Sequence, residues 1–230
     1  MLSICDLTIQ FTGNPVLKNI FLDIQKGESV ALMGANGTGK TSLLKSLVYL
    51  QPYTGTIQMD NLVLSRKTAA EFREKIGFIF QNPDDQLFCP TIEQDLSFGL
   101  ENKSIPEKEI QNRVKETLEM FGLQSFASRS AQSLSGGEKR MASLAAVMIM
   151  RPEMLILDEP TIFLDARARK ILVSALNDLT QTKIIATHDI AFAQKVCTRV
   201  VILNHGSIAA DAQPDLIFAD HTLMENSWLE

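Results

Sequence analysis

The sequence is poor in the residues that build disulfide frameworks, structural zinc sites and membrane spans. Three of its 230 residues are cysteines, and they are scattered at Cys5, Cys89 and Cys197. An odd and scattered set of this kind predicts neither a disulfide framework nor a zinc site. No apolar run approaches the ~20 residues of a membrane-spanning helix, since the longest, residues 144–150, is followed by an Arg-Pro pair. The N-terminus lacks the basic start and apolar core of a signal peptide, so we expect a cytosolic protein.

A surplus of positive charge is also missing. The 22 lysine and arginine residues are outnumbered by 27 aspartate and glutamate residues, which gives a formal net charge of −5. A domain dedicated to nucleic-acid binding is usually basic, so this balance argues against that class. The hydrophobic fraction of 45% is ordinary for a globular protein, and 230 residues can bury a full core as one large domain or as a domain with a subdomain.

Hydrophobic patterning predicts an α/β fold whose core is a mostly parallel sheet. Alternating β-branched and aromatic residues predict N-terminal antiparallel strands over residues 2–11 and 16–24. Short continuous apolar runs favour strands that are buried on both faces of a parallel sheet. Such runs occur at residues 29–33, 154–157, 183–187 and 199–203. Strand–helix alternation is typical of this fold class. The helical patterns between and after the runs cover residues 41–49, 166–179 and 190–196.

The middle of the chain is mostly helical in pattern. Within residues 106–121, apolar side chains recur at the spacing of one helix face, which is most simply explained by packing within its own domain. These side chains are Ile110, Val114, Leu118 and Phe121. We therefore expect a nucleotide-binding α/β core formed by residues 1–81 and 151–230, interrupted by a helical subdomain over residues 82–150.

A glycine-rich loop follows the buried run at residues 29–33. Residues 34–41 read Gly-Ala-Asn-Gly-Thr-Gly-Lys-Thr and fit the phosphate-binding pattern G-x-x-x-x-G-K-[ST]. Glycines let the backbone curl so that successive N–H groups face one anion, and the positive end of the following helix points there too. We expect Lys40 to bridge the β- and γ-phosphates, Thr41 to hold Mg²⁺ and Ser42 to reach the α-phosphate. A purely structural glycine turn is disfavoured by the strand before the loop and the helix after it.

A second apolar strand ends in two carboxylates, Asp158 and Glu159. In a parallel sheet this strand delivers both groups to the carboxyl edge, beside the phosphate-binding loop of a neighbouring strand. Asp158 is expected to bind Mg²⁺ directly or through water, and Glu159 to act as the general base for an attacking water molecule. Acidic residues that merely close a strand are the alternative.

Residues 134–138, Leu-Ser-Gly-Gly-Glu, form a second candidate anion site at the start of a helix over residues 139–150. Two separate phosphate-binding helix starts in one chain are explained by a composite site that is shared between two chains. The alternative is that Ser135 serves as the N-cap of its helix, a role that is compatible with the first.

In this order, the motifs resemble those of the ATPase subunit of ATP-binding-cassette transporters. The resemblance covers nearly the whole chain and implies a P-loop NTPase fold of ABC type, ATP hydrolysis, and ATP and Mg²⁺ as ligands. The motifs that carry it are residues 34–41, Gln81 after a strand, residues 134–138, residues 155–159, Leu164-Asp165 and His188.

The resemblance also implies roles for single residues. His188 would touch the γ-phosphate and hold the water, and Gln81 would contact Mg²⁺ and that water while sensing a membrane partner. Asp165 would face a second subunit. The implied catalytic residues are Glu159, His188 and Gln81, and the implied Mg²⁺ contacts are Thr41, Gln81 and Asp158. The implied ATP contacts are Phe11, Asn36, Gly37, Thr38, Gly39, Lys40, Thr41, Ser42, Ser135, Gly136, Gly137 and Asp165.

Two of these residues have competing interpretations. Phe11 stands where the family stacks an aromatic ring on adenine, but a phenylalanine in the strand core fits the same pattern. His188 follows a buried strand, where a histidine is often an ordinary core residue.

A finer resemblance points to the energy-coupling-factor branch of importers, which take up cobalt, nickel or vitamins. It lies in residues 81–88 and 90–99, and residues 134–140 and 184–189 are similar to the cobalt/nickel members in particular. It implies a peripheral ATPase at the cytoplasmic face of the membrane. Its implied partners are a second ATPase subunit, most simply a head-to-tail homodimer, a transmembrane coupling protein and a substrate-binding membrane protein. No nucleic-acid partner is expected.

Three alternatives compete with this function. The first is the same role for a vitamin such as biotin. The second is a non-transport ATPase of the same superfamily, but repair members carry long coiled coils and ribosomal members carry two joined ATPase domains. The third is a small-molecule kinase, which would have no use for residues 134–138.

Two further features carry hypotheses. Phe163 is bulky where the family usually has a small residue, close to the expected dimer contact. Leu87 and Phe88 follow Gln81 in an acidic segment, and we expect them to line a groove for a partner helix. For Leu87 and Phe88, packing inside the helical subdomain is the alternative.

Overall fold

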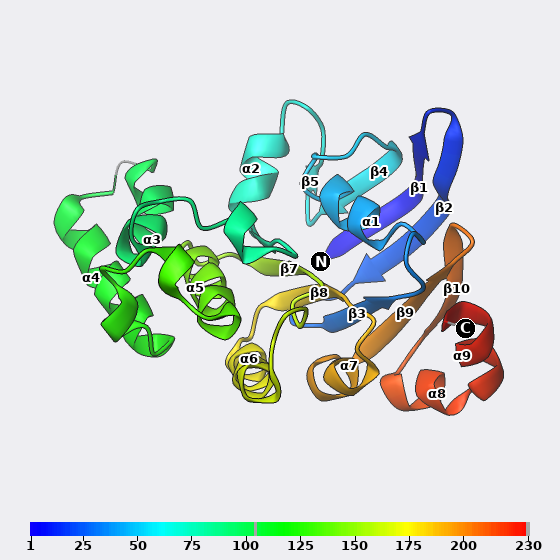
Figure 1. Ribbon diagram of the computed structural model, residues 1–230. Coiled ribbons are helices and arrows are strands. Elements are labelled where there is room, and N and C mark those ends of the chain that lie inside the picture. Colours follow the sequence, from blue (N-terminus) through cyan, green and yellow to red (C-terminus); the bar gives the residue numbers. More distant parts are fainter. Residues whose placement is uncertain (104, 229–230) are drawn as a thin grey trace. The chain divides into compact units, whose positions relative to one another are not determined.

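A computed structural model describes residues 1–103 and 105–228. The chain forms two compact units (Figure 1). The first comprises Met1–Ile76, Glu153–Glu159 and Thr180–Glu230, and the second comprises Gly77–Pro152 and Pro160–Leu179. Residues 160–179, which the sequence pattern assigns to the core, thus belong to the second unit. The division into a nucleotide-binding core and a helical subdomain over residues 82–150 stays a prediction.

The first unit opens with a four-stranded antiparallel sheet in the order β2-β1-β4-β5, which confirms the expected N-terminal antiparallel strands. Its strands are β1 (Leu2–Phe11), β2 (Asn14–Ile24), β4 (Thr54–Met59) and β5 (Leu62–Val63). Leu2 and Ile4 are buried, and so are Leu7 and Ile9. Strict alternation along the strand would instead bury position 6 after Ile4, so the pattern shifts by one residue between Ile4 and Leu7. The register shifts between Ile4 and Leu7, where Asp6 has a φ of +53°, so both pairs face the core.

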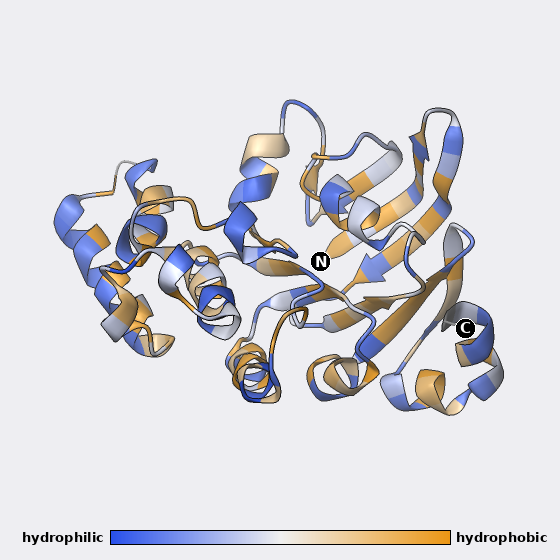
Figure 2. Cartoon of the chain, in the orientation of Figure 1, coloured by the Kyte–Doolittle hydropathy of each residue, from blue (hydrophilic) through white to orange (hydrophobic). Residues whose placement is uncertain are grey.

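A second sheet in this unit contains the predicted buried strands. Four parallel strands lie in the order β9-β3-β8-β7, and β10 pairs antiparallel with β9. Every residue of β3, β7 and β8 is buried, as their continuous apolar runs predict, and β7 and β9 are mostly hydrophobic in Figure 2. The strands are β3 (Ser29–Met33), β7 (Met154–Asp158), β8 (Thr182–Ala186), β9 (Arg199–Asn204) and β10 (Ser207–Ala212).

Short helices cover the parallel strands. In Figure 1, α1 lies on one side of β3 and β9, and α7 and α8 lie on the other. Leu43 and Leu44 of α1 and Phe192 of α7 are buried, so both faces of the sheet are covered. The helices of this unit are α1 (Lys40–Ser46), α2 (Ala69–Glu74), α7 (Ile190–Val196), α8 (Pro214–Ala219) and α9 (His221–Trp228).

The second unit is mainly helical. Ile110 and Leu118 of α4 are buried and α4 contacts α3, which supports the interpretation that this helix face packs within its own unit. The boundary between the units falls within the strand β6 (Ile76–Ile79): Ile76 belongs to the first unit, and the rest of the strand belongs to the second. The α-helices are α3 (Ile92–Glu101), α4 (Glu107–Met120), α5 (Gly136–Met148) and α6 (Ala166–Asp178). Single 3₁₀ turns are η1 (Pro83–Asp85), η2 (Gln124–Phe126) and η3 (Ala131–Ser133).

Within the described ranges, none of the helices is long and apolar enough to cross a membrane. The α/β class with a mostly parallel sheet is confirmed, and most predicted elements begin and end within three residues of the observed ones. The helix predicted from residue 139 starts at Gly136 instead, because Ser135 caps it and the glycines join its first turn.

Alanine substitutions at two glycines with positive φ, Gly13 and Gly55, test how rigid the antiparallel sheet is. A Cβ atom on Gly55 (φ +99°) would overlap the backbone carbonyl oxygen of Asp6 and lie 2.7 Å from that of Cys5. On Gly13 (φ +85°), a Cβ atom would have no neighbour within 4 Å. We expect Gly13→Ala to cost roughly 1–2 kcal/mol of unfolding free energy from backbone strain alone. Gly55→Ala should cost an additional ~1–3 kcal/mol from overpacking.

Thermal unfolding of the two variants measures this difference, because 1 kcal/mol corresponds to roughly 2–4 °C in Tm for a chain of this size. Equal losses for Gly13→Ala and Gly55→Ala would show that the backbone near Asp6 yields, contrary to the expectation.

Candidate nucleotide-binding site

The register of the parallel strands brings three chain segments to one sheet edge. Ala186 at the end of β8 pairs with Leu32 of β3 on one side and with Asp158 of β7 on the other. The three strands therefore end at the same level, and the segments that follow them emerge together. These segments are the loop that starts at Gly34, Glu159, and Thr187-His188. The sequence pattern suggested that the strand ending in Asp158 is the direct neighbour of the strand that leads into the loop. The structure instead places β8 between β3 and β7.

The loop at residues 34–41 has the backbone of an anion-binding turn. Gly37 and Gly39 have φ values of +83° and +99°, which residues with a side chain rarely adopt. A Cβ atom on Gly39 would also lie 2.8 Å from the side chain of Leu17. Glycine is therefore required at this position both by conformation and by space.

Lys40 is buried below this loop, with 7% of its surface exposed. Its ammonium group donates to the carbonyl oxygens of Gly34 at 2.7 Å and Ala35 at 3.0 Å. Burial lowers the pKa of Lys40, and the charges of Glu159 and Asp158 oppose this shift. A desolvated cation surrounded by carbonyl groups and carboxylates is well suited to a polyanionic ligand.

Thr41 and Asp158 meet where a magnesium ion is expected. The Thr41 hydroxyl donates to Asp158 Oδ1 at 3.1 Å. Asp158 is 4% exposed, and its burial raises the pKa of the carboxyl group, while the bond from Thr41 acts in the opposite direction. A hydroxyl and a carboxylate are the hard oxygen ligands that Mg²⁺ prefers, and a cation there would favour the ionised form. The two residues therefore fit the ion.

Glu159 and His188 form the second pair at this edge. His188 Nδ1 lies 2.9 Å from Glu159 Oε2. Glu159 has a φ of +45°, and its backbone N–H donates to Ala186 O at 2.9 Å, so the chain turns sharply as β7 ends. Strain of this kind is found at functional sites. The His188 side chain is 56% exposed, so the alternative of a buried core histidine is wrong.

A cavity of about 530 Å³ lies beside the loop and is lined partly by residues that the sequence analysis missed. Gly34, Ala35, Asn36 and His188 line it, and so do Ile190, Met224 and Glu225. Met224 and Glu225 come from α9, which no motif marks, and only the packing of the C-terminal helices brings them to the loop.

The remaining predicted residues of the first unit lie at its surface or just below it. Asn36 and Gly37 are exposed, and Thr38 and Ser42 are half-buried. Thr38 donates from its hydroxyl to Ala35 O at 2.9 Å. Phe11 is 45% exposed at the end of β1, so the alternative of a strand-core phenylalanine is wrong.

In the second unit, Ser135 caps α5 through a reciprocal pair of bonds. The Ser135 hydroxyl accepts from the Glu138 backbone N–H at 3.4 Å, and Ser135 N donates to Glu138 Oε2 at 2.7 Å. This donation holds the pKa of Glu138 below its usual value. The expected N-cap role is confirmed, and the helix begins with Gly136, which is exposed, and Gly137, which is half-buried.

Helix packing also requires a glycine at position 137. A Cβ atom on Gly137 would lie 2.6 Å from Ala168 Cβ of α6, so a side chain there would push the two helices apart. Asp165 caps α6 by accepting from the Ala168 backbone N–H at 2.7 Å.

Gln81 is exposed in the second unit and lines a cavity of about 630 Å³. Asp84, Leu134, Gly136, Lys139 and Phe163 line the same cavity. The expected contacts of Gln81, Ser135, Gly136, Gly137 and Asp165 with a nucleotide stay predictions, because these residues belong to the unit that does not contain the phosphate-binding loop.

The aromatic residues that carried hypotheses differ in exposure. Phe163 is 81% exposed and has a φ of +64°, so most of its surface is open to solvent. Leu87 is buried, whereas Phe88 is 65% exposed and its ring lies 5.0 Å from that of the half-exposed Phe98. The packing alternative therefore holds for Leu87 but not for Phe88.

The loop after β3, the buried lysine and the carboxylate pair at the end of β7 define a P-loop nucleoside triphosphatase. The profile of the ABC transporter family matches residues 17–162. The chain therefore belongs to the ATPases of the ABC transporter family, and it binds ATP with Mg²⁺ and hydrolyses it.

Individual relatives agree with this assignment. The chain is 36% identical over 236 residues to the energy-coupling factor transporter ATP-binding protein EcfA of Methanothermobacter thermautotrophicus, covering 100% of this chain and 76% of the relative. The solved structure of cbiO1 from Clostridium perfringens, described as part of the ABC transporter complex cbiONQ, is 36% identical. It matches with a TM-score of 0.86 over 97% of this chain and 92% of that one. The cassette MJ0796, solved as a dimer bound to ADP and Pi, is 27% identical with a TM-score of 0.83, over 93% and 99% of the two chains.

Proposed function

We propose that this ATPase powers an energy-coupling-factor importer from the cytoplasmic face of the membrane. The observation that carries the hydrolytic part is the shared sheet edge, where Thr41 meets Asp158 at 3.1 Å and His188 meets Glu159 at 2.9 Å. The similarity to EcfA and cbiO1 supports the branch.

Each residue at this edge has a proposed task in hydrolysis. The loop N–H groups and Lys40 bind the β- and γ-phosphates, and Thr41 and Asp158 hold Mg²⁺, which neutralises phosphate charge when it is bound. Glu159 accepts a proton from the attacking water molecule. His188 orients that water and the carboxylate, since its ring nitrogen already contacts Glu159 Oε2.

The proposed general base is tested by Glu159→Gln. The amide cannot accept the proton, so ATP hydrolysis should fall roughly 10²–10⁴-fold while ATP binding persists. Phosphate release measures hydrolysis, and titration with a fluorescent nucleotide measures binding. Lys40→Ala should instead lose binding, and Glu71→Gln, on the exposed surface of α2, is the matched control that changes neither. Near wild-type hydrolysis by Glu159→Gln would exclude this role for Glu159.

We also propose a head-to-tail homodimer that traps two ATP molecules. Ser135 and Gly137 of one chain would close over the nucleotide that the loop of the other chain holds. Support comes from the exposed start of α5 and from the dimeric structure of the related cassette MJ0796. ATP then joins the two chains and hydrolysis releases them, which is the motion that a membrane partner can use.

In the Glu159→Gln background, ATP should convert the protein from monomer to dimer, as measured by light scattering on a sizing column. Adding Ser135→Arg should abolish the dimer, because the bulky side chain blocks approach to the γ-phosphate, while nucleotide binding to the monomer persists. Ser133→Arg is the matched control, since Ser133 is also exposed and lies two residues away. A Ser135→Arg variant that still dimerises with ATP would contradict the composite site.

The proposed cargo is a cobalt or nickel ion, with a vitamin such as biotin as the alternative. Support for the metal comes from the resemblance of residues 134–140 and 184–189 to cobalt/nickel members. The ATPase would bind a transmembrane coupling protein and a substrate-binding membrane protein peripherally. The exposed pair Phe88 and Phe98 is a candidate contact for a partner helix.

Reconstitution with the membrane proteins encoded beside this gene tests the cargo. We expect ATP-dependent uptake of labelled cobalt or nickel into vesicles, with no uptake when Glu159→Gln replaces the wild type. Uptake of biotin without uptake of either metal would favour the alternative. Failure to co-purify with any membrane protein would contradict the transport role.

A further inference from the structure

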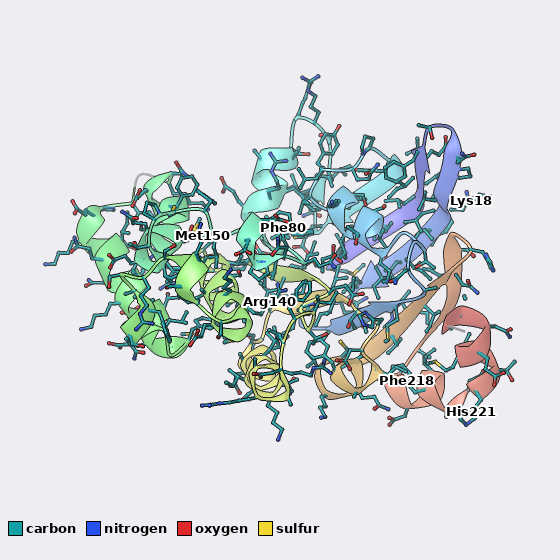
Figure 3. The ribbon with its side chains drawn as sticks, viewed as in Figure 1. Lys18, Phe80, Arg140, Met150, Phe218 and His221 are labelled. Atoms are coloured by element: carbon teal, nitrogen blue, oxygen red, sulfur yellow. The ribbon has the colours of Figure 1, made fainter. Side chains whose placement is uncertain are left out.

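We infer that Arg140 is a positioning residue that fixes the backbone at Gln81 to helix α5. This inference deepens the proposed function, because it rests on the proposed role of Gln81 in hydrolysis. Arg140 lies one turn beyond the start of α5 and is labelled in Figure 3 together with Phe80, one of the residues it binds.

The contacts of Arg140 are unusual for a charged side chain. It is 1% exposed and is among the largest fully buried side chains of the molecule. Its Nη1 donates to Phe80 O at 2.7 Å, and its Nη2 donates to Gln81 O at 2.6 Å. A planar guanidinium can bind two successive carbonyl groups at once, which an ammonium on a flexible stem does less well. The fork therefore sets the direction of the peptide units on which Gln81 stands.

Two further side chains tie the same segment to the same face of α5. Gln86 accepts from the Phe80 backbone N–H at 3.4 Å and donates to Ser143 O at 2.8 Å. The ammonium of Lys139 lies 2.6 Å from Asp84 Oδ1. Positions 140 and 143 are three apart on a helix, and positions 139 and 143 are four apart, so all three lie on one face.

The position of Arg140 on α5 has a consequence for the proposed cycle. Ser135 is the N-cap of the same helix, so one rigid element carries the proposed γ-phosphate contact and the anchor of Gln81. Hydrogen bonds from a buried charged group are costly to leave unmade, so the segment at residues 80–86 moves with α5 rather than apart from it. Closure of Ser135 over a partner's nucleotide would thus reposition Gln81 in its own chain.

Hydrogen–deuterium exchange of the nucleotide-free protein tests the anchor directly. We expect Arg140→Met to speed exchange in peptides that cover residues 80–87 at least about tenfold, because local opening no longer breaks the buried bonds. Peptides from the loop at residues 34–41 should be unchanged. Arg140→Lys keeps the charge and should give an intermediate effect. Arg113→Met is the matched control, since Arg113 forms a local ion pair with Glu109 within α4.

A double-mutant cycle with Gln81→Ala shows whether the anchor acts through Gln81. In the wild-type background, Arg140→Met should lower kcat roughly ten- to hundredfold, as a misplaced group does, with KM for ATP changed less than about twofold. In the Gln81→Ala background, the same substitution should lower kcat no further.

Different results would overturn the positioning role of Arg140 and the proposed role of Gln81. Unchanged exchange in residues 80–87, equally faster exchange throughout the protein, or an undiminished kcat loss in the Gln81→Ala background would each overturn the positioning role. If Arg140→Met does not fold, Arg140→Lys decides by the same measurements. A Gln81→Ala variant with wild-type kcat would instead remove the proposed role of Gln81, while the exchange result still decides whether Arg140 holds the segment.

Discussion

The common end of three parallel strands is the constraint on which the site depends. Because Ala186 pairs with both Leu32 and Asp158, the segments after β3, β7 and β8 must leave the sheet at the same level. Each strand is buried over its whole length, so a slip in register would disrupt the close packing of side chains on both faces and is strongly disfavoured. The hydrophobic core thereby fixes the distances between Thr41 and Asp158 and between Glu159 and His188.

This arrangement concentrates charge where water is scarce. Lys40, Asp158 and Glu159 are each less than 10% exposed, and burial acts against the charged forms of Lys40 and Asp158. Such a cluster is costly for the folded chain, but the same low dielectric strengthens its interaction with a triphosphate and a divalent cation. The left-handed backbone of Glu159 adds local strain to the same edge. Ligand binding therefore offsets costs that folding alone leaves in place.

In the second unit, helix α5 positions the candidate site residues, as the strand ends do in the first. Its capping box with Glu138 holds Ser135 at the surface, and its next turn binds the backbone of Phe80 and Gln81 through Arg140. Gly137 is small because α6 packs directly against it. Gly137 thus satisfies packing as well as any contact with phosphate, so glycine at this position is required by the free chain too.

The sequence by itself determined the fold class, the strands of the parallel sheet, the phosphate-binding loop and the carboxylate pair, because these depend on local pattern and on short motifs. It could not place β8 between β3 and β7, or bring Met224 and Glu225 to the loop, since both follow from long-range packing. It also left Phe11, His188 and Leu87 open, and only their burial decided between core and surface. Arg140 falls within the resemblance of residues 134–140, but its role has no signal in the sequence: a charged residue in a helix is normally solvated, and only the tertiary structure buries this one against two carbonyl groups.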